Sequence, residues 1–244
     1  MALQTRLLDY RDGALRCEGY LAWDDEFSGP RPAVAIAHTW AGRTEFECDK
    51  AHRLAELGYM GFALDMYGEG RQGGGPAGNA AFMQPLMNDR AALQRRIGAA
   101  ITALQALPEV DPRRVAAIGY CFGGLCVLDL ARSNARSNTP VRGVASFHGL
   151  FDPPGNTLGN PITAKVLCLH GYEDPMARPE ALVKLGAELT AAGTDWQIHA
   201  YGRTLHAFTR PDADDPARGI RYDANADRRS WRALVDFLEE VFNA

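Results

Sequence analysis

The sequence lacks the features that mark several large classes of protein. Its net charge is −4, from 26 Lys and Arg against 30 Asp and Glu, so it has no basic excess that would favour nucleic acid or an anionic membrane surface. No apolar run approaches the roughly 20 residues of a membrane-spanning helix. The first residues also lack the basic-then-apolar order of a signal peptide. We therefore expect no nucleic-acid partner and no membrane partner.

Cysteine is scarce and irregularly spaced. The five cysteines stand at positions 17, 48, 121, 126 and 168, an odd number with no C-x-x-C pair. This disfavours both a disulfide framework and a zinc site, and we expect neither a metal nor a cofactor. Because disulfides belong to oxidising compartments, the pattern favours a reduced, cytoplasmic protein.

Short apolar runs alternate with amphipathic segments along the chain. Its 244 residues and 46% hydrophobic content suit one globular domain over residues 1–244. Loose alternation over 3–10 and 14–23 predicts a hairpin at a sheet edge. Further strands are predicted at 33–37, 59–64, 115–119, 141–148, 164–170 and 196–201, and helices at 44–57, 80–107, 179–192 and from about 224. Such alternation predicts an α/β fold with a mainly parallel central sheet and helices on both faces.

The most informative motif is Gly119-Tyr-Cys121-Phe-Gly123, which follows a predicted strand and precedes a run that is compatible with a helix. It has the G-x-nucleophile-x-G form of a nucleophile elbow, with cysteine in place of serine. Glycines flank the nucleophile because a Cβ there would collide with the strand or the helix. The turn places the thiol at a helix N-terminus, where free N–H groups favour a thiolate and can bind an oxyanion. Most free cysteines are small buried apolar residues, so the functional interpretation depends on partners elsewhere.

A thiol nucleophile needs a base, and the base needs an acid to orient it. In a parallel sheet these groups lie in loops at the carboxyl ends of strands. His206 follows the last predicted strand, and Asp174 follows the strand that ends at His170. The chain order Cys121, Asp174, His206 is that of α/β-hydrolases. The same topology predicts two backbone N–H donors for an oxyanion hole, those of Phe122 and Trp40.

The other histidines are interpreted as structural. His38, His148 and His170 each close a strand, and we expect them to support loops through hydrogen bonds. His52 lies within a predicted helix and His199 within a predicted strand.

Residues 68–73 have the form G-x-G-x-x-G after a strand. The third glycine leads into more glycine and Pro76 instead of a helix, and no acidic residue follows at the required distance, so dinucleotide binding is disfavoured. We interpret 68–78 as a flexible loop near the mouth of an active site.

The sequence resembles the dienelactone hydrolase family of α/β-hydrolases from about residue 15 to its end. The resemblance depends on the elbow from Gly119 to Gly124, on His170-Gly-Tyr-Glu-Asp174-Pro175, and on His206-Ala-Phe208. It implies the α/β-hydrolase fold and hydrolysis of a small-molecule lactone or activated ester, through a thiolester acyl-enzyme and without a metal. We expect a monomer or a weak homodimer.

Two positions depart from the family pattern. The type enzyme has a glutamate directly after the histidine that matches His38, whereas this chain has Thr39, which cannot act as a base. Glu45 or Glu47 could replace it, but we interpret both as facing solvent. The type enzyme also grips a substrate carboxylate with two arginines, and the substrate-binding residues that the resemblance implies are Arg210, Arg71, Thr39 and Tyr67.

Of the two arginines only Arg210 matches in position, and it is equally well interpreted as a residue that fixes its loop.

Two other functions stay open. One is a broad carboxylesterase or thioesterase without a lactone preference. The other is a catalytically silent α/β-hydrolase that serves as a binding module.

Overall fold

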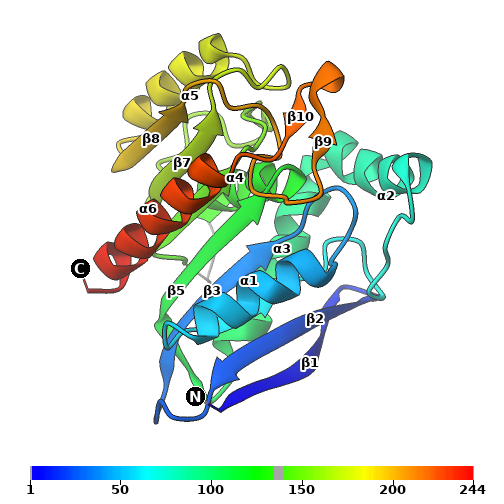
Figure 1. Cartoon of the computed structure of the whole chain (residues 1–244). Helices are drawn as coiled ribbons and strands as arrows, with labels where there is room; N and C mark the ends of the chain where they lie inside the picture. Colours follow the sequence, from blue (N-terminus) through cyan, green and yellow to red (C-terminus); the bar gives the residue numbers. More distant parts are fainter. Residues whose placement is uncertain (1, 135–139, 244) are drawn as a thin grey trace.

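The computed structural model describes residues 2–134 and 140–243. At its centre lies an eight-stranded sheet in the order β1-β2-β4-β3-β5-β6-β7-β8 (Figure 1). The hairpin β1–β2 lies at one edge, β2 pairs antiparallel with β4, and the remaining pairs are parallel. The strands are β1 (Leu3–Asp12), β2 (Leu15–Asp24), β3 (Arg31–Ala37), β4 (Met60–Ala63), β5 (Val110–Tyr120), β6 (Gly143–Phe147), β7 (Lys165–Gly171) and β8 (Trp196–Tyr201).

The central parallel strands are short and apolar because helices cover both faces of the sheet. Every residue of β4 and β6 is buried. One face packs against α1 (Glu45–Ala55) and α6 (Ala224–Asn243), and the other against α3 (Arg90–Gln105), α4 (Phe122–Asn134) and α5 (Pro179–Ala191) (Figure 1). The expected mainly parallel sheet with two helical layers is therefore confirmed.

The single helix predicted over 80–107 is wrong. The chain forms two helices, α2 (Pro76–Asn88) and α3, which are separated at Asp89. The Asp89 carboxylate accepts the Ala92 N–H at 2.9 Å and so caps the start of α3. Helix α2 also begins earlier than predicted, at Pro76. Proline fits the first turn of a helix because the backbone N–H that it lacks would have no partner within the helix there.

The segment 202–221, between the last predicted strand and the last predicted helix, contains a small ordered unit. It consists of β9 (Asp214–Asp215), a 3-10 turn η1 (Pro216–Arg218) and β10 (Ile220–Arg221). β9 and β10 pair antiparallel, and His206 forms an isolated bridge with Ile220. This unit holds the backbone at His206 in place through its pairing with Ile220.

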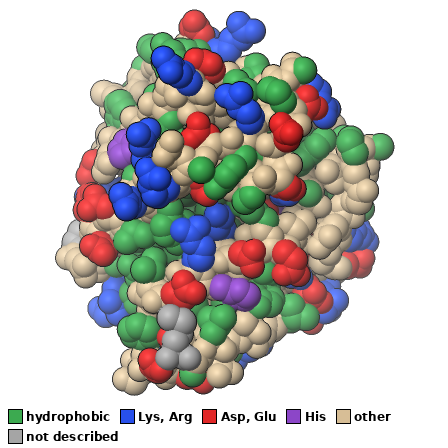
Figure 2. Space-filling view, in the orientation of Figure 1, with side chains coloured by type: hydrophobic (Ala, Val, Ile, Leu, Met, Phe, Trp, Pro, Cys, Tyr) green, Lys and Arg blue, Asp and Glu red, His purple; other side chains and the backbone are tan. Residues whose placement is uncertain are grey.

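The surface carries charge of both signs. On the face shown in Figure 2, acidic and basic side chains are intermingled with apolar ones. None of the helices within 2–134 and 140–243 is long and apolar enough to cross a membrane.

Candidate active site

The elbow has the strained geometry that its sequence predicts. Cys121 lies between the end of β5 and the start of α4 with a φ of 55°, in the left-handed region. Its N–H donates to the Phe147 carbonyl at 3.0 Å, which fixes the turn to the neighbouring strand. A Cβ on Gly119 would overlap the Gly123 backbone, and a Cβ on Gly123 would overlap the Ala37 carbonyl oxygen. Only glycine therefore allows the elbow to approach β3 so closely.

Asp174 and His206 form a buried pair at the carboxyl ends of β7 and β8. The Asp174 Oδ2 accepts the His206 Nδ1–H at 2.7 Å, and its Oδ1 accepts the Met176 N–H at 2.8 Å. This arrangement leaves His206 Nε2 as the ring atom for proton exchange. Both side chains are buried, whereas the Cys121 thiol is half-buried.

The loops that carry the acid and the histidine are joined to each other. The Glu173 N–H donates to the Thr204 carbonyl at 3.0 Å, and the His206 N–H donates to the Gly219 carbonyl at 2.9 Å. A Cβ on Gly219 would overlap the Pro175 ring. These contacts fix the imidazole relative to the carboxylate.

Cys121 and His206 shift each other's protonation. Burial raises the pKa of Cys121, but the charge and hydrogen bond of His206, with the Phe122 N–H, outweigh it and leave the pKa below its ordinary value. Burial opposes protonation of His206, yet the thiolate and Asp174 outweigh it and raise its pKa to about 10. Both shifts favour a thiolate–imidazolium pair over the neutral thiol and imidazole.

The other strand-end histidines are hydrogen-bonded loop supports, as predicted. His38 Nδ1–H donates to the Thr39 carbonyl at 2.6 Å, while its Nε2 accepts the Met66 N–H at 3.1 Å. His170 Nε2–H donates to the Ala177 carbonyl at 2.7 Å. His148 Nε2 lies 2.8 Å from Thr209 Oγ1, and its ring meets His206 edge-on at 5.1 Å between centroids. Burial lowers the pKa of all three.

Glu47 is the residue that the sequence interpretation placed wrongly. Glu45 is exposed as expected, but Glu47 is fully buried. Its Oε2 accepts the Thr44 N–H and Oγ1–H, both at 2.8 Å, and its Oε1 accepts the Thr39 N–H at 3.1 Å. The signal was present in the sequence, since Thr44-x-x-Glu47 is a capping box in which the glutamate turns back over the helix start.

This contact shapes the loop that follows β3. Thr39 is buried and its N–H is occupied by Glu47. Within the described part of the chain, the next amide, the Trp40 N–H, has no hydrogen-bond partner. The Trp40 carbonyl accepts the Tyr67 O–H at 2.8 Å. Among the described residues, the loop thus leaves the Trp40 N–H available as a donor.

Tyr67 packs against Phe122, the residue that follows Cys121. Its ring stacks on Phe122 at 6.0 Å and meets His38 edge-on at 4.6 Å. Burial and then the charges of Cys126, Cys121 and Glu47 raise the pKa of its hydroxyl. The phenol therefore stays protonated and serves as a donor.

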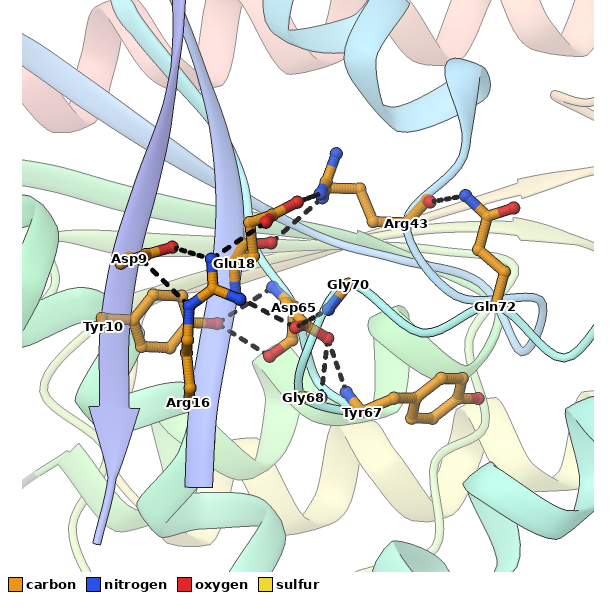
Figure 3. Close-up of polar contacts among 10 residues, drawn as sticks. All are labelled: Asp9, Tyr10, Arg16, Glu18, Arg43, Asp65, Tyr67, Gly68, Gly70 and Gln72. Carbon is orange, nitrogen blue, oxygen red and sulfur yellow. Dashed lines mark hydrogen bonds and ion pairs between the residues drawn. The ribbon is translucent and has the colours of Figure 1, made fainter. Parts of the chain in front are cut away.

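Asp65 fixes the start of the glycine-rich segment (Figure 3). Its Oδ1 accepts the N–H groups of Tyr67 and Gly68, at 2.9 and 2.8 Å. Its Oδ2 accepts those of Gly70 and Glu18, at 2.9 and 3.1 Å. Gly68 and Gly70 both have positive φ, which explains the glycines without a nucleotide.

The two arginines differ in position. Arg71 is exposed and ion-paired with Glu69, and the structure does not bring it into a contact with the catalytic residues. Arg210 is half-buried, and its guanidinium lies 5.2 Å above the Phe46 ring. A hydrogen bond with Asp212, and then the charges of Glu47 and Cys121, raise its pKa. The charge of Cys121 therefore reaches Arg210.

Within the described ranges, no group of three or more His, Cys, Asp or Glu side chains is arranged to hold a metal ion. The chemistry that this site offers is that of a thiolate, an imidazolium and free backbone N–H groups.

Comparison with known proteins identifies the family to which the chain belongs. The family model described as "Dienelactone hydrolase family" matches residues 17–242. A putative carboxymethylenebutenolidase of Yersinia pestis is 27% identical over 91% of this chain and 82% of its own. An uncharacterised Caenorhabditis elegans protein is 36% identical over 62% of this chain and 94% of its own.

Solved structures extend the similarity to the whole chain. A dienelactone hydrolase-like promiscuous phosphotriesterase from metagenomic libraries superimposes with a TM-score of 0.92 at 38% identity. The alignment covers 99% of this chain and 100% of that one.

Proposed function

The chain belongs to the dienelactone hydrolase family of α/β-hydrolases and is a carboxylic ester hydrolase, and we propose that it cleaves a lactone or an activated ester through a thiolester on Cys121. The observation that carries this proposal is the convergence of three groups. The elbow thiol, the buried imidazole of His206 and the carboxylate of Asp174 are coupled through hydrogen bonds and charge.

In the first half-reaction the Cys121 thiolate attacks the ester carbonyl carbon, and a C–S bond forms. The carbonyl oxygen becomes an oxyanion, which the N–H groups of Phe122 and Trp40 bind. As the intermediate collapses, the bond to the alcohol oxygen breaks, and the His206 imidazolium gives its proton to that oxygen. For a lactone the alcohol remains tethered to the acyl group.

In the second half-reaction neutral His206 accepts a proton from water, whose oxygen attacks the thiolester carbon. The C–S bond then breaks, the carboxylic acid leaves, and the thiolate–imidazolium pair is restored. Asp174 keeps the Nδ1–H in place, so Nε2 exchanges the proton in both steps. A thiolate is a better leaving group than an alkoxide, so poorly activated esters and amides should react slowly.

The direct test is to trap the acyl-enzyme. With p-nitrophenyl pentanoate, rapid quenching and peptide mass mapping should find the acyl group on Cys121 of the wild type. Cys121→Ala should lose kcat/KM by about three orders of magnitude or more and carry no acyl group. Cys48→Ala, which removes a buried thiol that the mechanism does not use, is the matched control and should retain both activity and acylation of Cys121. Undiminished turnover in Cys121→Ala would reject this nucleophile.

The two alternative functions, a broad esterase or thioesterase and a silent binding module, can be distinguished by assays with a substrate panel. A panel of lactones, aryl esters and thioesters distinguishes lactone preference from broad esterase or thioesterase activity. The family membership argues against a silent binding module, which would hydrolyse none of these substrates.

A second candidate activity is phosphotriester hydrolysis. It is supported by the similarity to the promiscuous phosphotriesterase over nearly the whole chain. The Cys121 thiolate would attack phosphorus to form a P–S bond, and the P–O bond to the alkoxide or phenoxide group would break. Water would then attack phosphorus, and the P–S bond would break to release the phosphodiester and restore the thiolate. Release of p-nitrophenol from diethyl p-nitrophenyl phosphate, abolished in Cys121→Ala, is the test.

A further inference from the structure

Arg210, which follows His206 by four residues, is already bound to a carboxylate of its own loop. Arg210 Nε and Nη2 donate to the two carboxylate oxygens of Asp212, at 3.0 and 2.7 Å. This is the bidentate arrangement in which a guanidinium would bind a substrate carboxylate. The Arg210 side chain is 24% exposed and that of Asp212 is 68% exposed, so the acid is the more solvent-accessible partner of the pair.

A second carboxylate acts on the same guanidinium from within the protein. The charge of buried Glu47 favours the cationic form of Arg210, as does that of Cys121. Phe46 lies beneath the guanidinium, which limits where a further partner could bind. Arg71, the other candidate, is ion-paired with Glu69.

Charges of both signs act on the thiol and on Arg210. His206 and Asp174 act on the thiol, and Asp212, Glu47 and Cys121 act on Arg210. An anionic substrate group that approached Arg210 would therefore meet a guanidinium that is already paired, and it would have to displace Asp212. A carboxylate two residues away in the chain has an effective concentration on the order of millimolar or higher, so a free carboxylate competes poorly.

We propose that Asp212 occupies the carboxylate-binding position of Arg210 and thereby restricts this enzyme to esters and lactones without an anionic group. The inference depends on the proposed esterase function and assigns its substrate class. It makes Asp212 a specificity-determining residue, which acts through Arg210 without touching the reacting atoms.

The experiment compares two substrates with the same leaving group and the same acyl length. They are p-nitrophenyl pentanoate, which is neutral, and mono-p-nitrophenyl glutarate, which ends in a carboxylate. In the wild type kcat/KM should be at least about tenfold higher for the pentanoate. In Asp212→Asn the guanidinium loses its anionic partner, and the preference should fall by about fivefold, mainly through a lower KM for the glutarate.

Asp214→Asn is the matched control, because Asp214 is an exposed acid of the same loop and its removal changes the net charge equally. Its preference should equal that of the wild type. A wild type that hydrolyses the glutarate as well as the pentanoate would overturn the inference, and so would an unchanged preference in a folded Asp212→Asn. Failure of the wild type to hydrolyse either ester would instead overturn the proposed function.

Discussion

The Oε1 atom of Glu47 accepts the Thr39 N–H at 3.1 Å, which ties the first turn of α1 to the loop after β3. The same carboxylate accepts two hydrogen bonds from Thr44, so three donors converge on it. Thr39 occupies the position at which the family resemblance places a glutamate. Here the acidic side chain comes from a helix and binds backbone, so its role is to hold the loop that presents the Trp40 N–H.

We expect Glu47→Gln to lower kcat about 10- to 100-fold with KM changed less than about threefold. An amide offers one acceptor oxygen where three donors converge, so the loop shifts and the oxyanion hole weakens. The free energy of unfolding should fall by about 1–3 kcal/mol.

Thr44→Ala is the matched control for this change. It removes the cap hydroxyl, at a cost of about 1 kcal/mol, but leaves the Thr39 contact in place. It should retain kcat. Equal losses of kcat in both variants would indicate that Glu47 acts only on the stability of the helix.

Alkylation by iodoacetamide should single out Cys121 among the cysteines. Burial raises the pKa of Cys17 to about 11 and that of Cys168 to about 12, whereas the pKa of Cys121 lies below its ordinary value. At neutral pH peptide mapping should find Cys121 labelled first. His206→Asn removes the imidazolium and should slow labelling by about tenfold or more, since each unit of pKa changes the thiolate fraction about tenfold. Equal labelling rates in the two proteins would contradict the thiolate–imidazolium pair.

The pH dependence of kcat/KM should have an alkaline limb set by His206. Its pKa is raised to about 10, so the imidazolium that protonates the leaving group persists below that pH and is lost above it. The acid limb, set by Cys121, should lie below the ordinary thiol value because its pKa is lowered. In His206→Asn the residual activity should lack the alkaline limb. An alkaline limb that survives this substitution belongs to another group.

Gly123→Ala should destabilise the fold severely. The added Cβ would overlap the Ala37 carbonyl oxygen and approach the His38 carbonyl at 2.7 Å, and neither backbone group can move without distorting β3. Thermal unfolding should show a loss of about 3 kcal/mol or more. Gly98→Ala is the control, because Gly98 lies within α3 with no atom near its Cβ position. That variant should gain about 0.5–1 kcal/mol. Similar effects of both substitutions would refute the close-packing argument.

The sequence predicted the positions of Cys121, Asp174 and His206 because the topology of a parallel sheet brings strand ends to one edge. It did not predict that the Glu47 side chain is buried, because its exposure was inferred from its charge. The capping box with Thr44 instead holds the carboxylate against the start of the helix. The helix break at Asp89 was missed for a similar reason. The apolar stripe continues across it, and only the capping bond to Ala92 reveals the new helix.

Arg210 illustrates a different limit of sequence reasoning. Its position after His206 matched the family resemblance, but whether its guanidinium is free depends on a turn that brings Asp212 back to it. That turn is stabilised by the Tyr222 N–H, which donates to the Ala213 carbonyl from nine residues further along. Contacts between loops of this kind leave no periodic pattern in a sequence.

The hydrogen bonds of Asp65 connect the outermost hairpin to the loop of the proposed oxyanion hole. Tyr10 in β1 bonds to the Asp65 backbone through its hydroxyl, and the Glu18 N–H in β2 donates to its side chain (Figure 3). The same aspartate orients Tyr67, whose hydroxyl binds the Trp40 carbonyl. Removal of the first strand would therefore disturb the proposed oxyanion hole through Asp65 and Tyr67. Turnover would fall although the nucleophile itself is intact.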